Sequence, residues 1–166
     1  MSDERGSGYE RTLFLLRHAK SSWDHPVSDH DRPLNERGLR DATAAGEMLA
    51  GRGWWPEVVL SSTALRARQT WEQAAAAGAG AGEVRYTERL YGATADELLG
   101  VVREAADELR SLMLIGHGPG LPELAVRLGG PIGRKYATCG LAVLRIDQPW
   151  SALDHAELVT FELPRG

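Results

Sequence analysis

The stretch "TLFLLRHAKSSWD", residues 12–24, changes character within a few positions. Residues 12–16 form an almost continuous apolar run, which is typical of a strand buried on both faces of a sheet. Arg17 and His18 follow at once, where such a strand is expected to end. In an open parallel sheet, ligands bind beyond the carboxyl ends of the strands, so this pair indicates a polar site at that edge.

Working outward, the chain alternates between strand and helix patterns. Further strands are predicted at 57–62, 83–87 (an edge strand), 112–115, 140–146 and 156–163, and helices at 36–51, 64–77, 94–110 and 121–130. Asn35 and Thr63 are the expected N-caps of the first two helices, and Thr94 with Glu97 forms a capping box on the third. This alternation predicts an α/β fold with a mainly parallel sheet.

The domain organisation is expected to be simple. Residues 1–11 read as a polar N-terminal arm and 12–166 as a single domain, because no linker or repeat divides them. The glycine-rich run at 78–82 follows a helix, whereas a dinucleotide-binding motif follows a strand, so we interpret it as a turn.

Composition excludes several classes of protein. The net charge of −4 gives no reason to expect binding to nucleic acid or to an anionic membrane. The single cysteine, Cys139, permits neither an intramolecular disulfide nor a cysteine metal cluster. The polar start and the lack of a long apolar run predict a cytoplasmic protein without a membrane segment, and a monomer is the default expectation.

Three of the predicted strands lead into groups that suit phosphate chemistry. The first leads into Arg17 and His18, the second into a helix that carries Arg66, and the fourth into His117. A parallel sheet would bring these groups to one edge. Arginines match phosphate oxygens in pairs, and a neutral imidazole can attack phosphorus. The fixed cations then replace a metal, so neither a metal nor another cofactor is expected.

Four ordered motifs carry a resemblance to a known family. "LLRHAKSSW" (15–23), "DRPLNERGLRDA" (31–42), "LSSTALRARQT" (60–70) and "LIGHGPGL" (114–121) resemble the histidine phosphatase superfamily, the phosphoglycerate-mutase-like proteins. The similarity spans roughly 12–128 and is strongest to the short branch of bacterial phosphohistidine phosphatases. It implies a three-layer sandwich with helices on both faces of the sheet.

The resemblance also implies a role for each matching residue. His18 matches the nucleophile that becomes transiently phosphorylated, and His117 matches the second histidine of the pocket. Arg17 and Arg66 match the two arginines that bind phosphate, and Arg32 matches a further arginine of the short branch that reaches the phosphate. The implied partner is a phosphorylated protein or a small phosphorylated substrate.

The sequence departs from the family pattern in ways that bear on the substrate. Members that act on phosphate esters usually place a carboxylate after the Arg66 helix, but Tyr91 follows Leu90 here. Glu88, Asp24 and Asp31 are the candidate substitutes. A site without a strong acid favours P–N over P–O cleavage, because imidazole is a far better leaving group than an alkoxide. The motifs around His18 and His117 also read Arg-His-Ala and His-Gly-Pro, where Arg-His-Gly and His-Asn-Pro are usual.

Three alternatives remain open at this point. The protein could be a small-molecule phosphomonoesterase of the same superfamily, or a phosphate-binding module without catalysis. A metal-dependent hydrolase is the third, with ligands from the 24–31 loop: Asp24, His25, Asp29, His30 and Asp31.

Overall fold

One mixed sheet forms the centre of the molecule. In the computed structural model, which describes residues 10–164, six strands lie in the order β3-β2-β4-β1-β5-β6. They are β1 (Arg11–Arg17), β2 (Val58–Ser62), β3 (Glu83–Thr87), β4 (Ser111–Gly116), β5 (Leu141–Ile146) and β6 (Glu157–Glu162). The first four are parallel to one another, β5 is antiparallel to its neighbour β1, and β6 is antiparallel to β5. The mainly parallel sheet and the edge position of β3 are as predicted.

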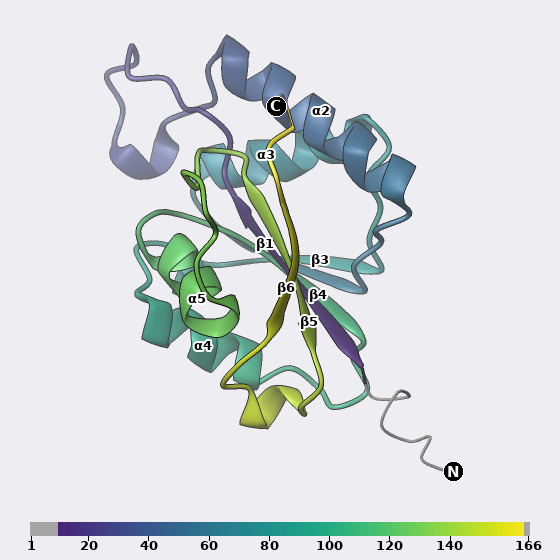
Figure 1. Ribbon diagram of the computed structural model, residues 1–166. Helices are drawn as coiled ribbons and strands as arrows, with labels where there is room; N and C mark the ends of the chain where they lie inside the picture. The colour runs from purple at the N-terminus through teal and green to yellow at the C-terminus, as the bar shows by residue number, and fades with distance from the viewer. Residues whose placement is uncertain (1–9, 165–166) are drawn as a thin grey trace.

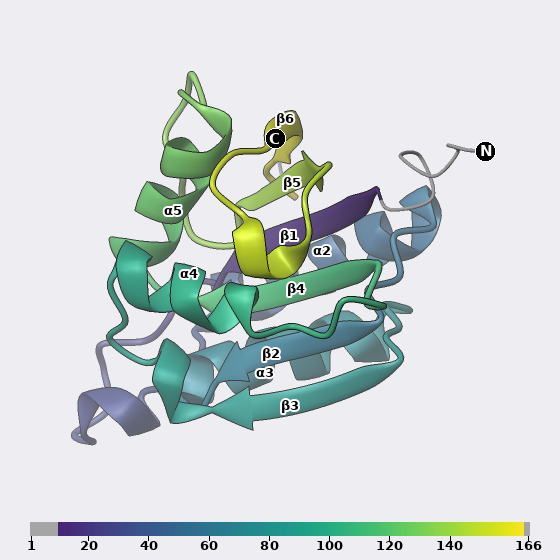
Figure 2. The ribbon, with the colours of Figure 1, turned by 90° about the horizontal axis from the view of Figure 1, so that it is seen from below.

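Helices cover both faces of this sheet, as Figures 1 and 2 show. Helices α2 (Glu36–Arg52) and α3 (Leu65–Ala76) lie on one face, and α4 (Ala95–Arg103) and α5 (Gly120–Gly129) lie on the other. Short 3₁₀ turns complete the fold: η1 (Asp29–Asp31), η2 (Glu88–Leu90) and η3 (Trp150–Ala152). The predicted three-layer α/β architecture is therefore confirmed.

The central strand β1 explains why the sheet is buried on both sides. Leu13 and Leu15 belong to the apolar cluster under α4 and α5, whereas Phe14 and Leu16 belong to the cluster under α2 and α3. Successive side chains of a strand point to opposite faces, so an unbroken apolar run serves both clusters at once. The strand carries Arg17 to the edge of the sheet, opposite Gly116 of β4.

Local sequence signals correctly predicted where helices α2 and α4 begin. The Asn35 side chain accepts a hydrogen bond from the N–H of Gly38 at 2.8 Å, as an N-cap should. The predicted capping box of Thr94 and Glu97 is present at the start of α4.

Other boundaries differ from the expectation. Strand β1 begins at Arg11, one residue earlier than predicted, and Arg11 is buried; residues 1–9 of the expected polar arm lie outside the described part. The N-cap of α3 is Ala64 rather than Thr63, and its side chain makes no capping hydrogen bond; the Ala64 N–H donates to the Ser62 hydroxyl at 3.1 Å. Thr63 instead bonds to His30 at 2.8 Å.

The third helix is shorter than its apolar stripe suggested. Helix α4 ends at Arg103, although the pattern predicted a helix to residue 110. Leu109 still packs on the apolar cluster, but from a turn, and its carbonyl accepts a hydrogen bond from the indole of Trp150 at 2.7 Å. The apolar stripe therefore continues past the helix into a non-helical segment that packs against the η3 turn. Within residues 10–164, no helix has the length and apolarity needed to span a membrane.

Candidate active site

A hollow of about 260 Å³ lies where β1 and β4 end. All five side chains that the sequence singled out line it: Arg17, His18, Arg32, Arg66 and His117. They come from four separate segments, and the parallel sheet brings them together as expected. Further lining residues, which sequence reasoning did not select, are Lys20, Ser21, Trp23, Gly118 and Thr138.

Backbone contacts fix the end of β1 on three sides. The N–H of His18 donates to the Gly116 carbonyl of β4 at 3.0 Å. The N–H of Cys139, just before β5, lies 3.0 Å from the carbonyls of both Arg17 and His18. The N–H of Ala19 donates to the Thr70 hydroxyl of α3 at 2.9 Å. The two functional side chains therefore project from a rigid anchor.

His18 is held as a neutral base with one defined tautomer. Its side chain is 93% buried by area, since only 7% of it is exposed. Its Nδ1 lies 2.7 Å from the Ala19 carbonyl, which can only accept, so Nδ1 carries the proton and Nε2 keeps a lone pair. Burial is the largest cause that lowers the pKa of His18 to about 3; the nearby His117, Arg66 and Arg17 add to it, and the hydrogen bond to Ala19 acts in the opposite direction. Nε2 is therefore available as a nucleophile at neutral pH.

His117 faces His18 across the hollow, with the two ring centres 5.0 Å apart. Its Nε2 lies 2.8 Å from the hydroxyl of Ser62, and its Nδ1 is buried without a partner among the described residues. Burial, followed by the charge of Arg66, lowers the pKa of His117 to about 4. The ring is thus neutral, and its unpartnered nitrogen is left for a ligand.

Each of the three arginines donates hydrogen bonds from its Nη atoms, whereas its Nε has no partner among the described residues. Arg17 donates from Nη1 to the Tyr136 carbonyl at 2.9 Å, Arg66 donates from Nη1 to the Asp29 carbonyl at 2.8 Å, and Arg32 donates to the Ser21 hydroxyl. The Nε of each is buried and has no hydrogen-bond partner in the described part of the chain. Buried donors without partners are rare, so three beside one hollow point to an anion that would accept from them.

Two lining residues explain details of the local sequence. A Cβ at Gly118 would lie 3.3 Å from Nη2 of Arg17, so the glycine gives this guanidinium room at the position where the family usually has Asn. Trp23 stacks on Arg32, with its ring centre 3.7 Å from the guanidinium carbon, yet 76% of Trp23 is exposed. The indole therefore forms an exposed rim of the hollow.

The carboxylate that contacts the site is Asp29. Its Oδ1 accepts from Nη2 of Arg32 at 3.0 Å and its Oδ2 from Nη2 of Arg66 at 3.1 Å. The candidate substitutes Glu88, Asp24 and Asp31 do not line the hollow. Sequence reasoning considered Asp29 only as a metal ligand, although its spacing of three from Arg32 in a short turn was a usable signal.

Tyr91 occupies the region where ester-cleaving relatives carry their acid. Its ring packs edge-on against His117 at 5.6 Å and against His30 at 4.9 Å. Its hydroxyl donates to Oδ2 of Asp29 at 2.7 Å. A hydrogen bond from Tyr91, then one from Arg32, lowers the pKa of Asp29 well below its usual range, so Asp29 is ionised and has no proton to give.

The 24–31 loop does not gather a ligand set for a metal. His25 lies beside the Ser22 hydroxyl at 3.1 Å, His30 beside Thr63, and Asp29 between the arginines. No three His, Cys, Asp or Glu side chains between residues 10 and 164 are arranged to hold a metal ion. The loop thus lacks the coordination geometry that the metal-dependent alternative requires.

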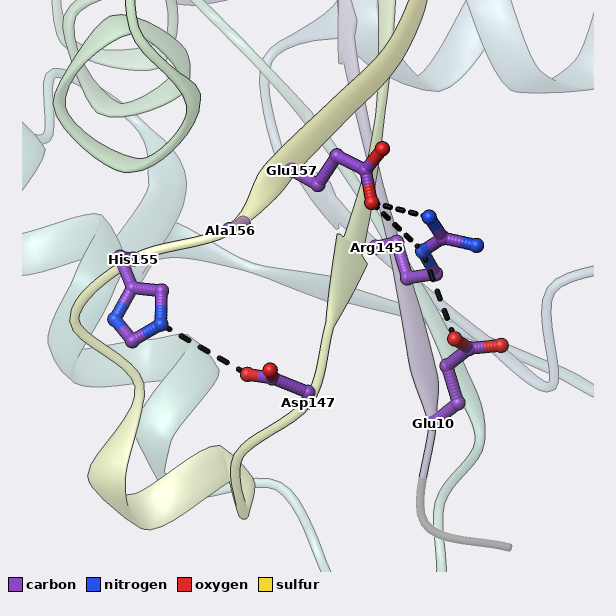
Figure 3. A pocket seen from close by; sticks show the side chains of 6 residues that line it. All are labelled: Glu10, Arg145, Asp147, His155, Ala156 and Glu157. Carbon is purple, nitrogen blue, oxygen red and sulfur yellow. Dashed lines mark hydrogen bonds and ion pairs between the residues drawn. The ribbon is translucent and has the colours of Figure 1, made fainter. Parts of the chain in front are cut away.

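A second hollow, of about 430 Å³, lies beside Arg145 of β5, which pairs with the start of β1 at the opposite end of that strand from His18 (Figure 3). Arg145 contacts Glu157 and also Glu10, at 3.5 Å, and His155 lies 3.8 Å from Asp147. Its arginine is already neutralised by carboxylates, so this hollow does not share the anion-binding character of the first.

Known proteins resemble this chain in sequence and in fold. The model of the histidine phosphatase superfamily (branch 1) matches residues 13–114. An uncharacterised protein of Mycobacterium tuberculosis is 38% identical over 162 residues, which cover 90% of this chain and 100% of the relative. The solved structure of a candidate phosphohistidine phosphatase SixA from Nakamurella multipartitia has a TM-score of 0.79 and 35% identity, covering 95% of this chain and 98% of that one.

A second solved structure, the candidate phosphohistidine phosphatase SixA of Agrobacterium tumefaciens, is 32% identical with a TM-score of 0.78, over 92% of this chain and 97% of that one. These neighbours share the phosphoglycerate-mutase-like fold that the motifs predicted. The family model covers more than half of the chain, and the ordered motifs surround one hollow. The chain therefore belongs to the histidine phosphatase superfamily, within its branch 1.

Proposed function

We propose that this protein is a phosphatase that forms a phosphohistidine intermediate on His18 and acts on phosphohistidine in other proteins. The observation that carries the proposal is the state of His18: a buried, neutral ring with Nδ1 bonded to Ala19 and Nε2 left with a lone pair. A module that only bound phosphate would have no need of such a base beside three unpartnered arginine donors.

The reaction proceeds in two displacements. Nε2 of His18 attacks phosphorus, the bond between phosphorus and the substrate imidazole breaks, and the imidazole leaves with the electron pair. Water then attacks the phosphoryl group on His18, which releases inorganic phosphate and restores the neutral ring. Arg17, Arg32, Arg66 and His117 stabilise the charge on the phosphoryl oxygens in both steps.

The lack of a proton donor supports phosphohistidine as the substrate class. Asp29 is ionised and lies behind the arginines rather than in the lining of the hollow. An alkoxide leaving group needs a donor, whereas an imidazole protonated on its other nitrogen leaves as a neutral molecule. The related SixA structures carry names of the same substrate class.

The rim supports a protein as the bearer of the phosphoryl group. Trp23 and Val27 are exposed large apolar residues on the loop that leads from His18 to Arg32. Large exposed aromatic residues beside a functional site are typical of contact surfaces for macromolecules. The loop projects from the sheet edge near the first turn of α2 (Figure 1).

The experiment that tests the proposal is chemical trapping. The enzyme is mixed with a ³²P-phosphohistidine protein and quenched in alkali, in which phosphohistidine survives, and the label is mapped by peptide analysis. Label is expected on His18, and His18→Ala should show neither label nor turnover. Near-normal turnover by His18→Ala would rule out the proposed nucleophile.

A parallel rate comparison decides between substrate classes. The wild-type enzyme is assayed on a phosphohistidine protein, on phosphoramidate and on several phosphate monoesters. We expect the highest kcat/KM on the phosphohistidine protein. A higher kcat/KM on a small ester would instead make the protein a small-molecule phosphomonoesterase of the same superfamily.

A further inference from the structure

Two of the three arginines that line the hollow, Arg32 and Arg66, donate hydrogen bonds to the same carboxylate, that of Asp29. Asp29 accepts from Arg32 at 3.0 Å and from Arg66 at 3.1 Å, and its backbone carbonyl accepts from Arg66 at 2.8 Å. The carboxylate is half-exposed, whereas both guanidiniums are buried. Asp29 is not among the residues that line the hollow, so it acts on a ligand only through the two arginines.

These contacts occupy the Nη atoms of both guanidiniums and fix the orientation of each group. Arg66 uses both Nη atoms on Asp29, and Arg32 uses one on Asp29 and the other on Ser21. In both residues the Nε is the buried nitrogen without a partner among the described residues. Asp29 thereby fixes the rotation of both planar groups, which would otherwise turn about their long side chains.

Asp29 is itself held firmly enough to do this. It opens the 3₁₀ turn η1, and the Tyr91 hydroxyl donates to its Oδ2 at 2.7 Å. Three side chains therefore donate to one carboxylate, which keeps it ionised.

Asp29 also offsets positive charge. The buried Arg32 and Arg66 and the half-buried Arg17 place three positive charges around the hollow, the exposed Lys20 adds one more, and both histidines are neutral. No acidic side chain lines the hollow. Asp29 is thus the contact that lowers the net charge felt by a phosphoryl group, and an excess of charge would slow the release of the product.

We propose that Asp29 is a positioning residue of the phosphate site: it orients Arg32 and Arg66 and reduces their positive field, so that phosphate is bound in a reactive geometry and then released. This inference rests on the proposed phosphatase function, which it deepens.

The test compares Asp29→Asn with Asp31→Asn. Asp31 lies two residues away in the same turn and bonds only to Ser28 and His30 among the contacts described here, so its variant makes the same charge change without touching an arginine. The readouts are kcat and KM on phosphoramidate, the Kd of inorganic phosphate and the Tm of each variant.

We expect Asp29→Asn to lower kcat by about tenfold or more, because the arginines lose their fixed geometry. Phosphate should at the same time bind about threefold more tightly, because one negative charge is removed. Asp31→Asn should match the wild type in both. A merely structural role would instead weaken phosphate binding together with kcat and would lower the Tm, and that result would overturn the proposal.

Tyr91→Phe separates the two effects, because it loosens Asp29 without removing its charge. It should lower kcat and leave the Kd of phosphate unchanged. The phosphate-binding measurements stand whether or not the enzyme acts on phosphohistidine, so failure of the proposed substrate class and failure of this inference are distinguishable. Equal behaviour of the Asp29 and Asp31 variants would refute the inference alone.

Discussion

His18 combines two properties that a nucleophilic imidazole needs: a fixed tautomer and a low proton affinity. Both come from its position at the end of a buried strand, where Ala19 takes the Nδ1 proton and burial lowers the pKa to about 3. The ordinary histidine pKa is about 6.5. The neutral, reactive form of His18 should therefore persist well below neutral pH.

This predicts an unusual pH–rate profile. After correction for ionisation of the substrate, kcat/KM on phosphoramidate should stay level from about pH 8 to pH 5, because the free enzyme keeps His18 neutral over that range. The measurement is a steady-state rate series in buffers of constant ionic strength. An inflection near pH 6.5 that belongs to the enzyme would show that His18 is better solvated than its burial indicates.

The same pKa shift predicts a dependence of stability on pH. Between about pH 3 and pH 6.5 the unfolded chain binds a proton at His18 that the folded chain does not, so the free energy of unfolding should fall as the pH drops through this window. The slope from one such histidine is at most about 1.4 kcal/mol per pH unit. Urea unfolding of the wild type and of His18→Asn should show a shallower decline in the variant; equal slopes would argue against the shift.

At this scale the sequence identified most of the pocket but not its electrostatics. Arg17, His18, Arg66 and His117 were predictable because each follows a recognisable strand within an ordered motif. Only part of the environment of Asp29 was predictable: Arg32 is three residues away, but Arg66 and Tyr91, which also donate to its carboxylate, are 37 and 62 residues away in the chain. Contacts of that kind are fixed by the packing of loops, which leaves no periodic signal in the sequence.

Among the elements, α3 and the end of β1 are linked through a single hydroxyl, that of Thr70. Thr70 accepts from the Ala19 N–H at 2.9 Å and donates to the Arg66 carbonyl at 2.7 Å, and all three groups are buried. It thereby links the strand that carries His18 to the helix that carries Arg66.

Thr70→Val keeps the shape of the side chain but leaves the Ala19 N–H without a partner. We expect the free energy of unfolding to fall by about 1–3 kcal/mol, as for other buried donors that lose their acceptor. Thr43→Val is the matched control, because the Thr43 hydroxyl accepts only a long contact from Gln73 at 3.4 Å. Denaturant unfolding should separate the two variants, and equal stabilities would contradict this account of Thr70.

The element boundaries show where local signals are sufficient. The Asn35 cap and the Thr94–Glu97 box act within one turn, so they located the starts of α2 and α4 correctly. The predicted end of α4 was wrong because the apolar stripe continues beyond the helix: Leu109 packs on the same cluster from a non-helical segment, where its carbonyl bonds to Trp150. The antiparallel direction of β5 relative to β1 could not be predicted either, because the apolar pattern of β5 does not indicate the direction of the strand.

At the scale of the whole molecule, most of the positive charge around the proposed phosphate site comes from guanidiniums that the fold fixes in place. Activity should therefore be retained after dialysis against EDTA, because no step of the proposed reaction needs a divalent ion. The measurement is turnover of phosphoramidate before and after chelation, with added Mg²⁺ or Zn²⁺ as controls. Loss of turnover that a divalent ion restores would contradict the proposed mechanism.

The arrangement of the whole site also determines which leaving groups it can expel. No carboxyl side chain is among the described residues that line the hollow, and the carboxylate of Asp29, which contacts Arg32 and Arg66, is ionised. Across a series of phosphate monoesters, the rate should therefore fall steeply as the pKa of the leaving group rises. General acid catalysis is worth about 10²–10⁴-fold, so alkyl phosphates should be slower than phosphohistidine by a factor on that scale.

The measurement is single-turnover kinetics, so that chemistry rather than product release limits the rate. A series of aryl phosphates with different leaving-group pKa values gives the slope of the logarithm of the rate against that pKa. An alkyl phosphate and phosphoramidate extend the series at either end. A shallow slope, with an alkyl phosphate cleaved as fast as an activated aryl phosphate, would mean that the site holds a proton donor. Tyr91 would then be the first residue to replace, since its hydroxyl is next to Asp29 and its ring packs against His117. If Tyr91→Phe steepened the slope, the donor would be that phenol, and the preference for P–N cleavage would need another cause.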